Sequence, residues 1–137
     1  MPRILAIDYG NKRTGLAVTD NLKMIATSLT VLHPKELIPF LKEYVKKEEV
    51  ECIVIGRPTN LDNTENEIEK DIRSFIVDLK KNFPGLKIER IDERFTSKIA
   101  QQTILEAGIK KMKRRNKSLA DKVSATIILQ SYLVTVR

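Results

Sequence analysis

The chain of 137 residues contains one cysteine, one histidine and no tryptophan. Cys52 alone can form neither a disulfide framework nor a zinc site built from several cysteines. No apolar run reaches the roughly 18 residues that a membrane-spanning helix needs, so we expect no membrane partner. The first residues also lack the apolar core and cleavage site of a signal peptide, and we therefore expect a cytoplasmic location.

The shortage of histidine and aromatic residues argues against two kinds of chemistry, histidine-dependent hydrolysis and extensive stacking on nucleobases. His33 is the one histidine, so hydrolysis by a Ser/His or Cys/His pair lacks support. We interpret His33 as a turn residue before Pro34, and Cys52 as a core residue among apolar neighbours. Aromatic residues make up 5% of the chain, so little stacking on nucleobases is expected.

Positive charge is in excess, with 25 Lys and Arg against 18 Asp and Glu and a net charge of +7. Residues 110–117 hold six of these basic residues and no acid, so the rest of the chain is nearly balanced. Contacts from such a run to phosphate give affinity without sequence specificity. We expect nucleic-acid binding by Lys110, Lys111, Lys113, Arg114, Arg115 and Lys117.

The hydrophobic pattern predicts an α/β fold in one domain, residues 1–137. Strands are expected at residues 3–9, 14–19, 24–32, 51–56 and 87–92. Helices are expected from near residue 36, from a capping box at Thr64 and Glu67, from residues 96–97 to 108, and over 118–134. Because tight turns join the first three strands and helices separate the others, we expect a five-stranded mixed sheet, antiparallel and then parallel, flanked by helices.

Acidic residues occupy the positions where α/β sheets carry their sites, outside the carboxyl ends of strands. Asp8 ends the first predicted strand, and the pair Asp92 and Glu93 ends the fifth. Asp121 projects along the apolar stripe of the last predicted helix, near Ala125. An acid that points inward needs a partner, and a divalent cation is one candidate.

Each of these acids also has a structural explanation. Asp8 fits a turn, Asp121 fits a capping box with Ser118, and an ion pair with Arg94 fits the acids at residues 92–93. Taken together, however, an acid-rich and histidine-poor set suits metal-assisted hydrolysis of phosphodiesters. Two Mg²⁺ or Mn²⁺ ions about 3.5 to 4 Å apart can hold a phosphodiester for in-line attack, and no histidine base is needed.

Four motifs follow one another along the chain. They are residues 8–15 (DYGNKRTG), residues 56–58 (GRP), residues 92–97 (DERFTS), and Asp121 with Ala125 and residues 127–132 (IILQSY). In this order and spacing they resemble the bacterial YqgF family, relatives of the RuvC resolvase with an RNase H-like fold. The resemblance covers essentially the whole chain.

This resemblance implies a metal-dependent nuclease with its site on Asp8, Glu93 and Asp121, and it selects Glu93 over Asp92. Two functions are implied for the family: maturation of the 5′ end of pre-16S rRNA, which we favour, and Holliday junction resolution. The ribosomal precursor particle would then be a partner that supplies specificity. Arg57 departs from the family pattern, in which that residue is usually apolar, and Asn63 stands where a glycine is usual.

Basic side chains near the predicted site complete the expected nucleic-acid contacts. Lys12 and Arg13 lie in the turn after Asp8, where they can meet phosphate or form a solvated hairpin tip. A guanidinium at Arg57 would help to hold a phosphodiester backbone.

Two other classes of protein share parts of this pattern. Actin-like ATPases and sugar kinases also open with a strand, an Asp-x-Gly turn and a hairpin, but they need two such domains and this chain has length for one. A non-catalytic nucleic-acid-binding module would use residues 110–117, while the acids serve as caps and ion pairs. Substitution of the acids distinguishes the two classes: a binding module would bind nucleic acid normally without them and show no cleavage, whereas a nuclease would lose cleavage.

Overall fold

The computed structural model describes residues 2–20, 25–58, 67–92 and 117–135, except for the side chains of residues 117–123. The strands are β1 (Arg3–Asp8), β2 (Thr14–Thr19), β3 (Ala26–Leu32), β4 (Val50–Arg57) and β5 (Lys87–Asp92). The helices are the 3-10 turn η1 (Pro34–Glu36), α1 (Leu37–Lys47), α2 (Glu69–Asn82) and α5 (Lys117–Thr135). The helix predicted from residues 96–97 to 108 lies outside the described residues. None of the described helices is long and apolar enough to cross a membrane.

The five strands form one mixed sheet in the order β3-β2-β1-β4-β5. Neighbours are antiparallel between β1 and β2 and between β2 and β3, and parallel between β1 and β4 and between β4 and β5. The predicted sheet is therefore confirmed, including the bounds of β5. Strand β3 begins at Ala26, two residues later than predicted. Just before it, the Asp20 N–H donates to the Ile25 oxygen at 3.1 Å and the Ile25 N–H donates to Asp20 Oδ1 at 3.0 Å.

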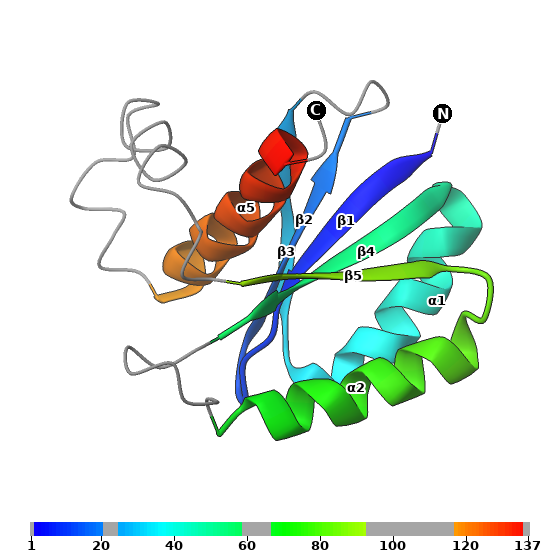
Figure 1. The fold of residues 1–137 in the computed structure, drawn as a ribbon, viewed down its shortest axis with the longest axis horizontal. Helices are drawn as coiled ribbons and strands as arrows, with labels where there is room; N and C mark the ends of the chain where they lie inside the picture. The colour runs from blue at the N-terminus through cyan, green and yellow to red at the C-terminus, as the bar shows by residue number, and fades with distance from the viewer. Residues whose placement is uncertain (1, 21–24, 59–66, 93–116, 136–137) are drawn as a thin grey trace.

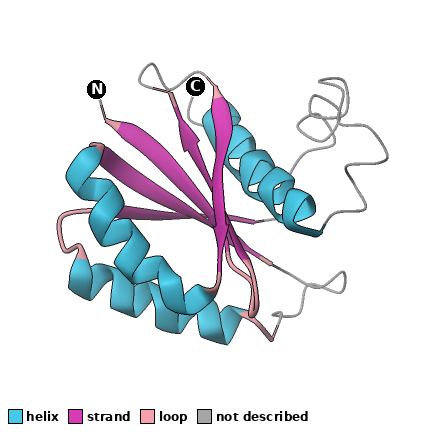
Figure 2. Ribbon diagram, turned by 180° about the vertical axis from the view of Figure 1, so that it is seen from behind, coloured by secondary structure: helices cyan, strands magenta, loops and turns pink. Residues whose placement is uncertain are grey.

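Helices cover both faces of this sheet (Figures 1 and 2). Helices α1 and α2 lie on one face, and α5 crosses the other. Strand β1 lies at the centre and is buried on both sides: Leu5 and Ile7 belong to the core under α1 and α2, whereas Ile4 and Ala6 belong to the core under α5. Its apolar residues at both parities are typical of a strand covered on both faces.

Helix starts differ from the predictions in one case. Helix α1 follows η1, where His33 Nδ1 accepts a hydrogen bond from the Lys35 backbone N–H at 3.1 Å, so the only histidine is a cap. Helix α2 begins at Glu69, so the prediction of a start at Thr64 is wrong. Its N-cap residue, Ile68, makes no side-chain capping hydrogen bond. Ion pairs to Glu69, rather than a capping box, anchor its first turn.

Candidate functional site

The carboxyl ends of three parallel strands meet at one edge of the sheet. Asp8 ends β1, Arg57 ends β4 and Asp92 ends β5. In the register of the sheet, Ile7 pairs with Ile55, and Arg57 pairs with Asp92. The fold therefore places Asp8 and Asp92 at one edge of the sheet, as predicted. Arg57 lies between them, because β4 lies between β1 and β5.

A tight turn follows Asp8 and depends on Gly10. A Cβ atom at this position would lie 2.2 Å from the backbone oxygen of Arg13, a contact that no side chain tolerates. The backbone N–H of Gly10 donates to Thr14 Oγ1 at 3.3 Å, and this buried hydroxyl can donate back to the Gly10 oxygen at the same distance. The turn is thereby closed directly beside the carboxylate, with Lys12 and Arg13 exposed on it.

Alternation along the strands separates the acids between the two faces of the sheet. Asp8 has the parity of Ala6, which packs under α5. Asp92 has the parity of Arg90, whose guanidinium binds Glu69 of α2, whereas Ile91 between them packs under α5. Because successive side chains point to opposite faces, Asp8 lies on the α5 side and Asp92 on the α2 side.

The other predicted acids are only partly described. Residue 121 lies in α5, four residues before the buried Ala125 and therefore on the same side of the helix, but its side chain is outside the described set. Glu93 and the basic residues 110–115 lie outside the described residues, and of Lys117 only the backbone, as the first residue of α5, is described.

The donor chemistry at this edge suits a hard divalent cation. Among the described residues, no three His, Cys, Asp or Glu side chains are close enough to form a metal site, and only Asp8 of the three predicted ligands is described with its side chain. His33 caps η1, and Cys52 is buried in the core, where burial raises the pKa of its thiol. The carboxylate oxygens of Asp8 are the kind of ligand that Mg²⁺ and Mn²⁺ prefer.

A charged cluster that the sequence did not predict lies on the α2 side of the same edge. The side chain of Glu69 is 1% exposed, and both of its oxygens bind the Arg90 guanidinium, at 2.6 and 3.0 Å. Arg73 and Arg57 reach the same carboxylate with their Nε atoms at 3.4 and 3.8 Å. Arg57, which we expected to hold a phosphodiester, is therefore also tied to Glu69.

Opposing effects act on the pKa of Glu69. Burial raises the pKa of this carboxyl group, but the Arg90 hydrogen bond and the charges of Arg90, Arg73 and Arg57 outweigh it, so the pKa lies below 4.5. Glu69 therefore stays ionised in the folded protein at neutral pH. The charge at α2's first turn also favours the helix dipole.

The position of Glu69 along α2 is the sequence feature that could have indicated that its side chain is buried. It lies three residues before Ile72 and belongs to the stripe that α2 buries against the sheet. The same reasoning that selected Asp121 would have selected it. In a segment as rich in Glu and Lys as residues 65–71, however, an acid ordinarily belongs to the solvated face.

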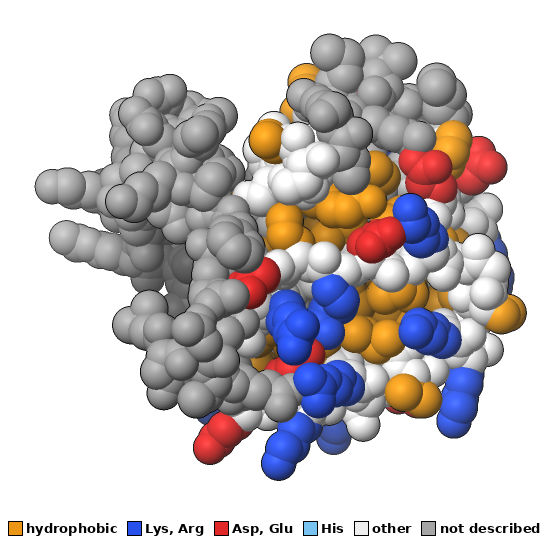
Figure 3. Space-filling model, in the orientation of Figure 1, with side chains coloured by type: hydrophobic (Ala, Val, Ile, Leu, Met, Phe, Trp, Pro, Cys, Tyr) orange, Lys and Arg blue, Asp and Glu red, His pale blue; other side chains and the backbone are white. Residues whose placement is uncertain are grey.

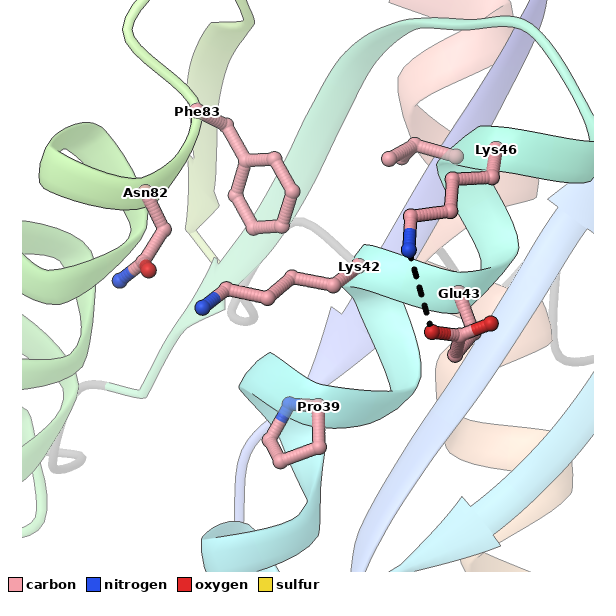
Figure 4. Close-up of a pocket in the computed structure, with 7 residues that line it drawn as sticks. Pro39, Lys42, Glu43, Lys46, Asn82 and Phe83 are labelled. Carbon is pink, nitrogen blue, oxygen red and sulfur yellow. Dashed lines mark hydrogen bonds and ion pairs between the residues drawn. The ribbon is translucent and has the colours of Figure 1, made fainter.

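Two pockets among the described residues are lined by neither Asp8 nor Asp92. One of about 560 Å³ lies between α1 and α2, where the Lys42 side chain extends from α1 toward Asn82 (Figure 4). Asn82 and Glu69 are the two ends of α2, which separates this pocket from the sheet edge by about 20 Å at 1.5 Å per residue. A second pocket of about 320 Å³ is lined by Tyr9 and Phe75, whose ring centroids are 5.4 Å apart, and by Asp71 and Asp78 of α2. Neither pocket brings Asp8 together with another acid.

Comparisons with known proteins agree over nearly the whole chain. A family model described as "RuvX: Holliday junction resolvase" matches residues 2–135. A protein of Porphyromonas gingivalis is 58% identical over 133 residues, which are 97% of this chain and 96% of that protein. A protein of Christiangramia forsetii is 53% identical over 133 residues, 97% of this chain and 98% of its own. Both bear the name "Putative pre-16S rRNA nuclease".

Solved structures match at lower identity. RuvC of Thermus thermophilus in complex with Holliday junction substrate superimposes with a TM-score of 0.63 and 13% identity, covering 99% of this chain and 97% of that chain. Another Thermus thermophilus RuvC structure gives a TM-score of 0.56 and 14% identity, covering 98% and 96%. At such identities the likeness shows the fold alone, and it confirms the predicted RNase H-like fold.

Proposed function

Because the chain belongs to the RuvX family, as the match over residues 2–135 shows, we propose that it is a metal-dependent nuclease that matures the 5′ end of pre-16S rRNA. Membership confirms the resemblance that the four sequence motifs indicated. The observation that carries the RNA function is the identity of 50% or more, over nearly full length, to relatives named for this activity. We place the activity in the cytoplasm, in residues 1–137 acting as one domain.

The proposed catalytic residues are Asp8, Glu93 and Asp121, which would hold two Mg²⁺ or Mn²⁺ ions. The position of Asp8 supports this: it is half-buried at the end of the central strand and fixed by the Gly10 turn. Residue 93 is favoured over Asp92 because alternation along β5 directs Asp92 to the α2 side, away from Asp8. The bound ions would supply activation of water and stabilisation of the leaving oxygen.

Basic residues would attract the substrate to these acids, which repel phosphate in the absence of cations. Lys12 and Arg13 are exposed beside Asp8, and Lys117 opens the helix that carries Asp121. The proposed nucleic-acid contacts are Lys12, Arg13, Arg57, Lys110, Lys111, Lys113, Arg114, Arg115 and Lys117. Because these contacts provide little sequence readout, we propose that the ribosomal precursor particle supplies the specificity.

Holliday junction resolution is the second candidate, and the description of the matching family model favours it. A resolvase cuts two strands symmetrically and would act as a two-fold dimer. The discriminating experiment incubates the purified protein and Mn²⁺ with a precursor 16S rRNA and, in parallel, with a synthetic four-way DNA junction.

The two activities predict different outcomes of this experiment. RNA maturation predicts cleavage at the 5′ boundary of the mature rRNA and an intact junction, whereas resolution predicts paired nicks in the junction. Binding to both substrates without any cleavage, unaffected by Asp8→Asn, would instead identify a non-catalytic nucleic-acid-binding module.

A further inference from the structure

The pocket of about 320 Å³ lies at the same edge of the sheet as Asp8. Tyr9, which lines it, directly follows Asp8 and packs against the core under α1 and α2. Pro34 and Lys35 line it from η1, just after β3 ends. Strands β1 and β3 run in the same direction, because both are antiparallel to β2. The pocket therefore lies at the carboxyl edge, on the face opposite α5.

Apolar side chains form one part of this pocket. The rings of Tyr9 and Phe75 are tilted by 37° with centroids 5.4 Å apart, and Pro34 and Ile38 add to this lining. Proteins hold unstacked nucleobases against aromatic side chains of this kind. Small-molecule pockets begin at about 300 Å³, so the volume suits one base rather than a longer stretch of RNA. Base contacts are expected to be few in a chain with 5% aromatic residues, and this pocket takes one.

Polar side chains line the rest of the pocket. Asp71, Ser74 and Asp78 come from one side of α2, and Lys35 comes from η1. Lys and Arg side chains lie over β5 and the start of α2 in the space-filling view (Figure 3), whereas this pocket is lined by two acids and one lysine. Its charge therefore disfavours phosphate and favours a group that donates hydrogen bonds.

Asp71 is the acid of this pocket that acts on Tyr9. Burial raises the pKa of the Tyr9 hydroxyl, and the charge of Asp71 raises it further. Because solvent screens charges that lie far apart, the carboxylate is near that hydroxyl. Within the described part of the chain, the Asp71 carboxylate makes no hydrogen bond or ion pair. Asp78 lies seven residues further along α2, about 10 Å from Asp71 at 1.5 Å per residue.

The polar groups around Asp71 match the Watson–Crick edge of guanine. That edge presents two adjacent N–H donors beside one carbonyl acceptor. A carboxylate can accept two parallel N–H bonds, and a Lys ammonium can donate to the carbonyl. Adenine, cytosine and uracil each present a single donor group on this edge. They would leave one carboxylate oxygen without a partner, so guanine is the base that this set of groups selects.

The geometry points to a binding pocket for one guanine base of the RNA substrate, in which Asp71 accepts its two N–H groups, Lys35 donates to its carbonyl and Tyr9 packs against it. This pocket rests on the proposed nuclease function, since Asp8 would hold the ions at the cleaved phosphodiester. Asp8 lies on the α5 side and Tyr9 on the other. The bound RNA therefore crosses the carboxyl edge with one base unstacked. The pocket adds a point of sequence readout that contacts to phosphate do not provide.

An Arg or Lys side chain of a protein partner is the competing occupant, because acids and aromatic rings also suit a cation. Two observations favour the base. Lys35 lines the same pocket, and its ammonium group repels a second cation. Tyr9 also lies between Asp8 and the turn that Gly10 and Thr14 close, where the proposed substrate passes.

The test measures binding of GMP, AMP, CMP and UMP to isotope-labelled protein by NMR titration. Divalent ions are left out, so that no phosphate is held at Asp8 through a metal. All four nucleotides carry the same ribose and phosphate, so the ratio of their Kd values reports the base. We expect GMP to shift the amide signals of Tyr9 and Ser74 and to bind at least about fivefold more tightly than UMP, the discrimination that one bidentate pair provides.

The variant is Asp71→Asn, and the matched control is Asp78→Asn, which removes the same charge from the same side of α2. Loss of a negative charge alone tightens the binding of all four nucleotides and keeps their order, and this is the result expected of Asp78→Asn. For Asp71→Asn we expect the Kd values of GMP and UMP to come within about twofold of each other. Well-dispersed spectra of both variants show that folded proteins are compared.

Several outcomes would overturn the pocket. These are equal Kd values of the four nucleotides in the wild type, unmoved signals of Tyr9 and Ser74 up to the solubility limit of GMP, and a GMP preference that Asp71→Asn keeps. Tighter binding of N-acetyl-arginine amide than of GMP at these signals would assign the pocket to a protein partner instead.

The pocket and the nuclease function can fail separately. If precursor 16S rRNA is not cleaved but the wild type prefers GMP and Asp71→Asn does not, the nuclease function fails while the pocket stands. Cleavage of the precursor by a wild type without any GMP preference would mean the opposite.

Discussion

At the residue scale, Glu69 is buried where a carboxylate would lose most of its hydration. Its two short hydrogen bonds to Arg90 and the charges of Arg57 and Arg73 offset that loss. Such a group stabilises the fold only while it stays charged. Removing one member of a buried pair is costly because the remaining charge has no partner, and here the solvent that reaches the arginines reduces the cost.

We predict that Glu69→Gln lowers the free energy of unfolding by about 2 to 3 kcal/mol at pH 7, measured by urea denaturation. Because the folded pKa of Glu69 lies below its ordinary 4.5, the carboxylate stabilises the protein fully above about pH 4.5. This contribution is lost as pH falls through the folded pKa. The difference between wild type and variant should therefore be constant at higher pH and shrink in acid.

The matched control for this experiment is Glu43→Gln. Glu43 is 68% exposed and pairs with Lys46 at 3.4 Å, so its loss should change the free energy of unfolding by less than about 0.5 kcal/mol. Equal costs for the two substitutions, or a difference that persists unchanged well below pH 4, would contradict the assigned charge of Glu69.

Gly10 provides a second test at this scale. We predict that Gly10→Ala costs about 1 to 3 kcal/mol of stability and lowers RNA cleavage roughly tenfold or more, because the turn beside Asp8 must open to accept a Cβ atom. Gly85→Ala, where a Cβ atom meets nothing within 4 Å, should leave both unchanged. Denaturation and initial-rate assays on the two variants measure the contrast, and full activity in Gly10→Ala would show that the turn does not position Asp8.

At the element scale, α5 is both a layer of the core and the support of residue 121. Leu129 is fully buried against the sheet, whereas Val134 in the same helix is 61% exposed. We predict that Leu129→Ala lowers the free energy of unfolding by about 2 to 5 kcal/mol and that Val134→Ala stays within about 0.5 kcal/mol. Urea denaturation of both variants tests whether α5 packs as described, and similar costs would contradict it.

Elements with strong patterns were predictable from the sequence. The bounds of β5 matched the prediction, and α5 begins and ends within one residue of the expected helix over 118–134. Apolar periodicity determines such elements because most of their stability comes from one buried face. The start of α2 was not predictable in this way, because a local capping pattern at Thr64 competed with long-range ion pairs to Glu69.

At the scale of the whole molecule, the parallel strands determine where chemistry is placed. Asp8 could be assigned to the carboxyl edge from sequence because its strand ends there, and the fold confirms that position. The cluster around Glu69 joins residues 12, 4 and 21 positions away. Sequence spacing contains little information on ion pairs between residues that only the fold of the sheet brings together. Arg57 was therefore predicted as a phosphate contact, and its ion pair with Glu69 was not predicted.

The central claim is that Asp8 holds the metal ions of a nuclease, and Asp8→Asn tests it most directly. The measurement is single-turnover cleavage of precursor 16S rRNA across a Mn²⁺ titration, with RNA binding followed in parallel and Asp78→Asn, an exposed acid of α2, as the matched control. Loss of a direct ligand should exceed the roughly 10–100-fold effect of outer-shell changes. The prediction is cleavage lowered by more than about 100-fold with binding retained; cleavage by Asp8→Asn at the wild-type rate and metal dependence would contradict the claim.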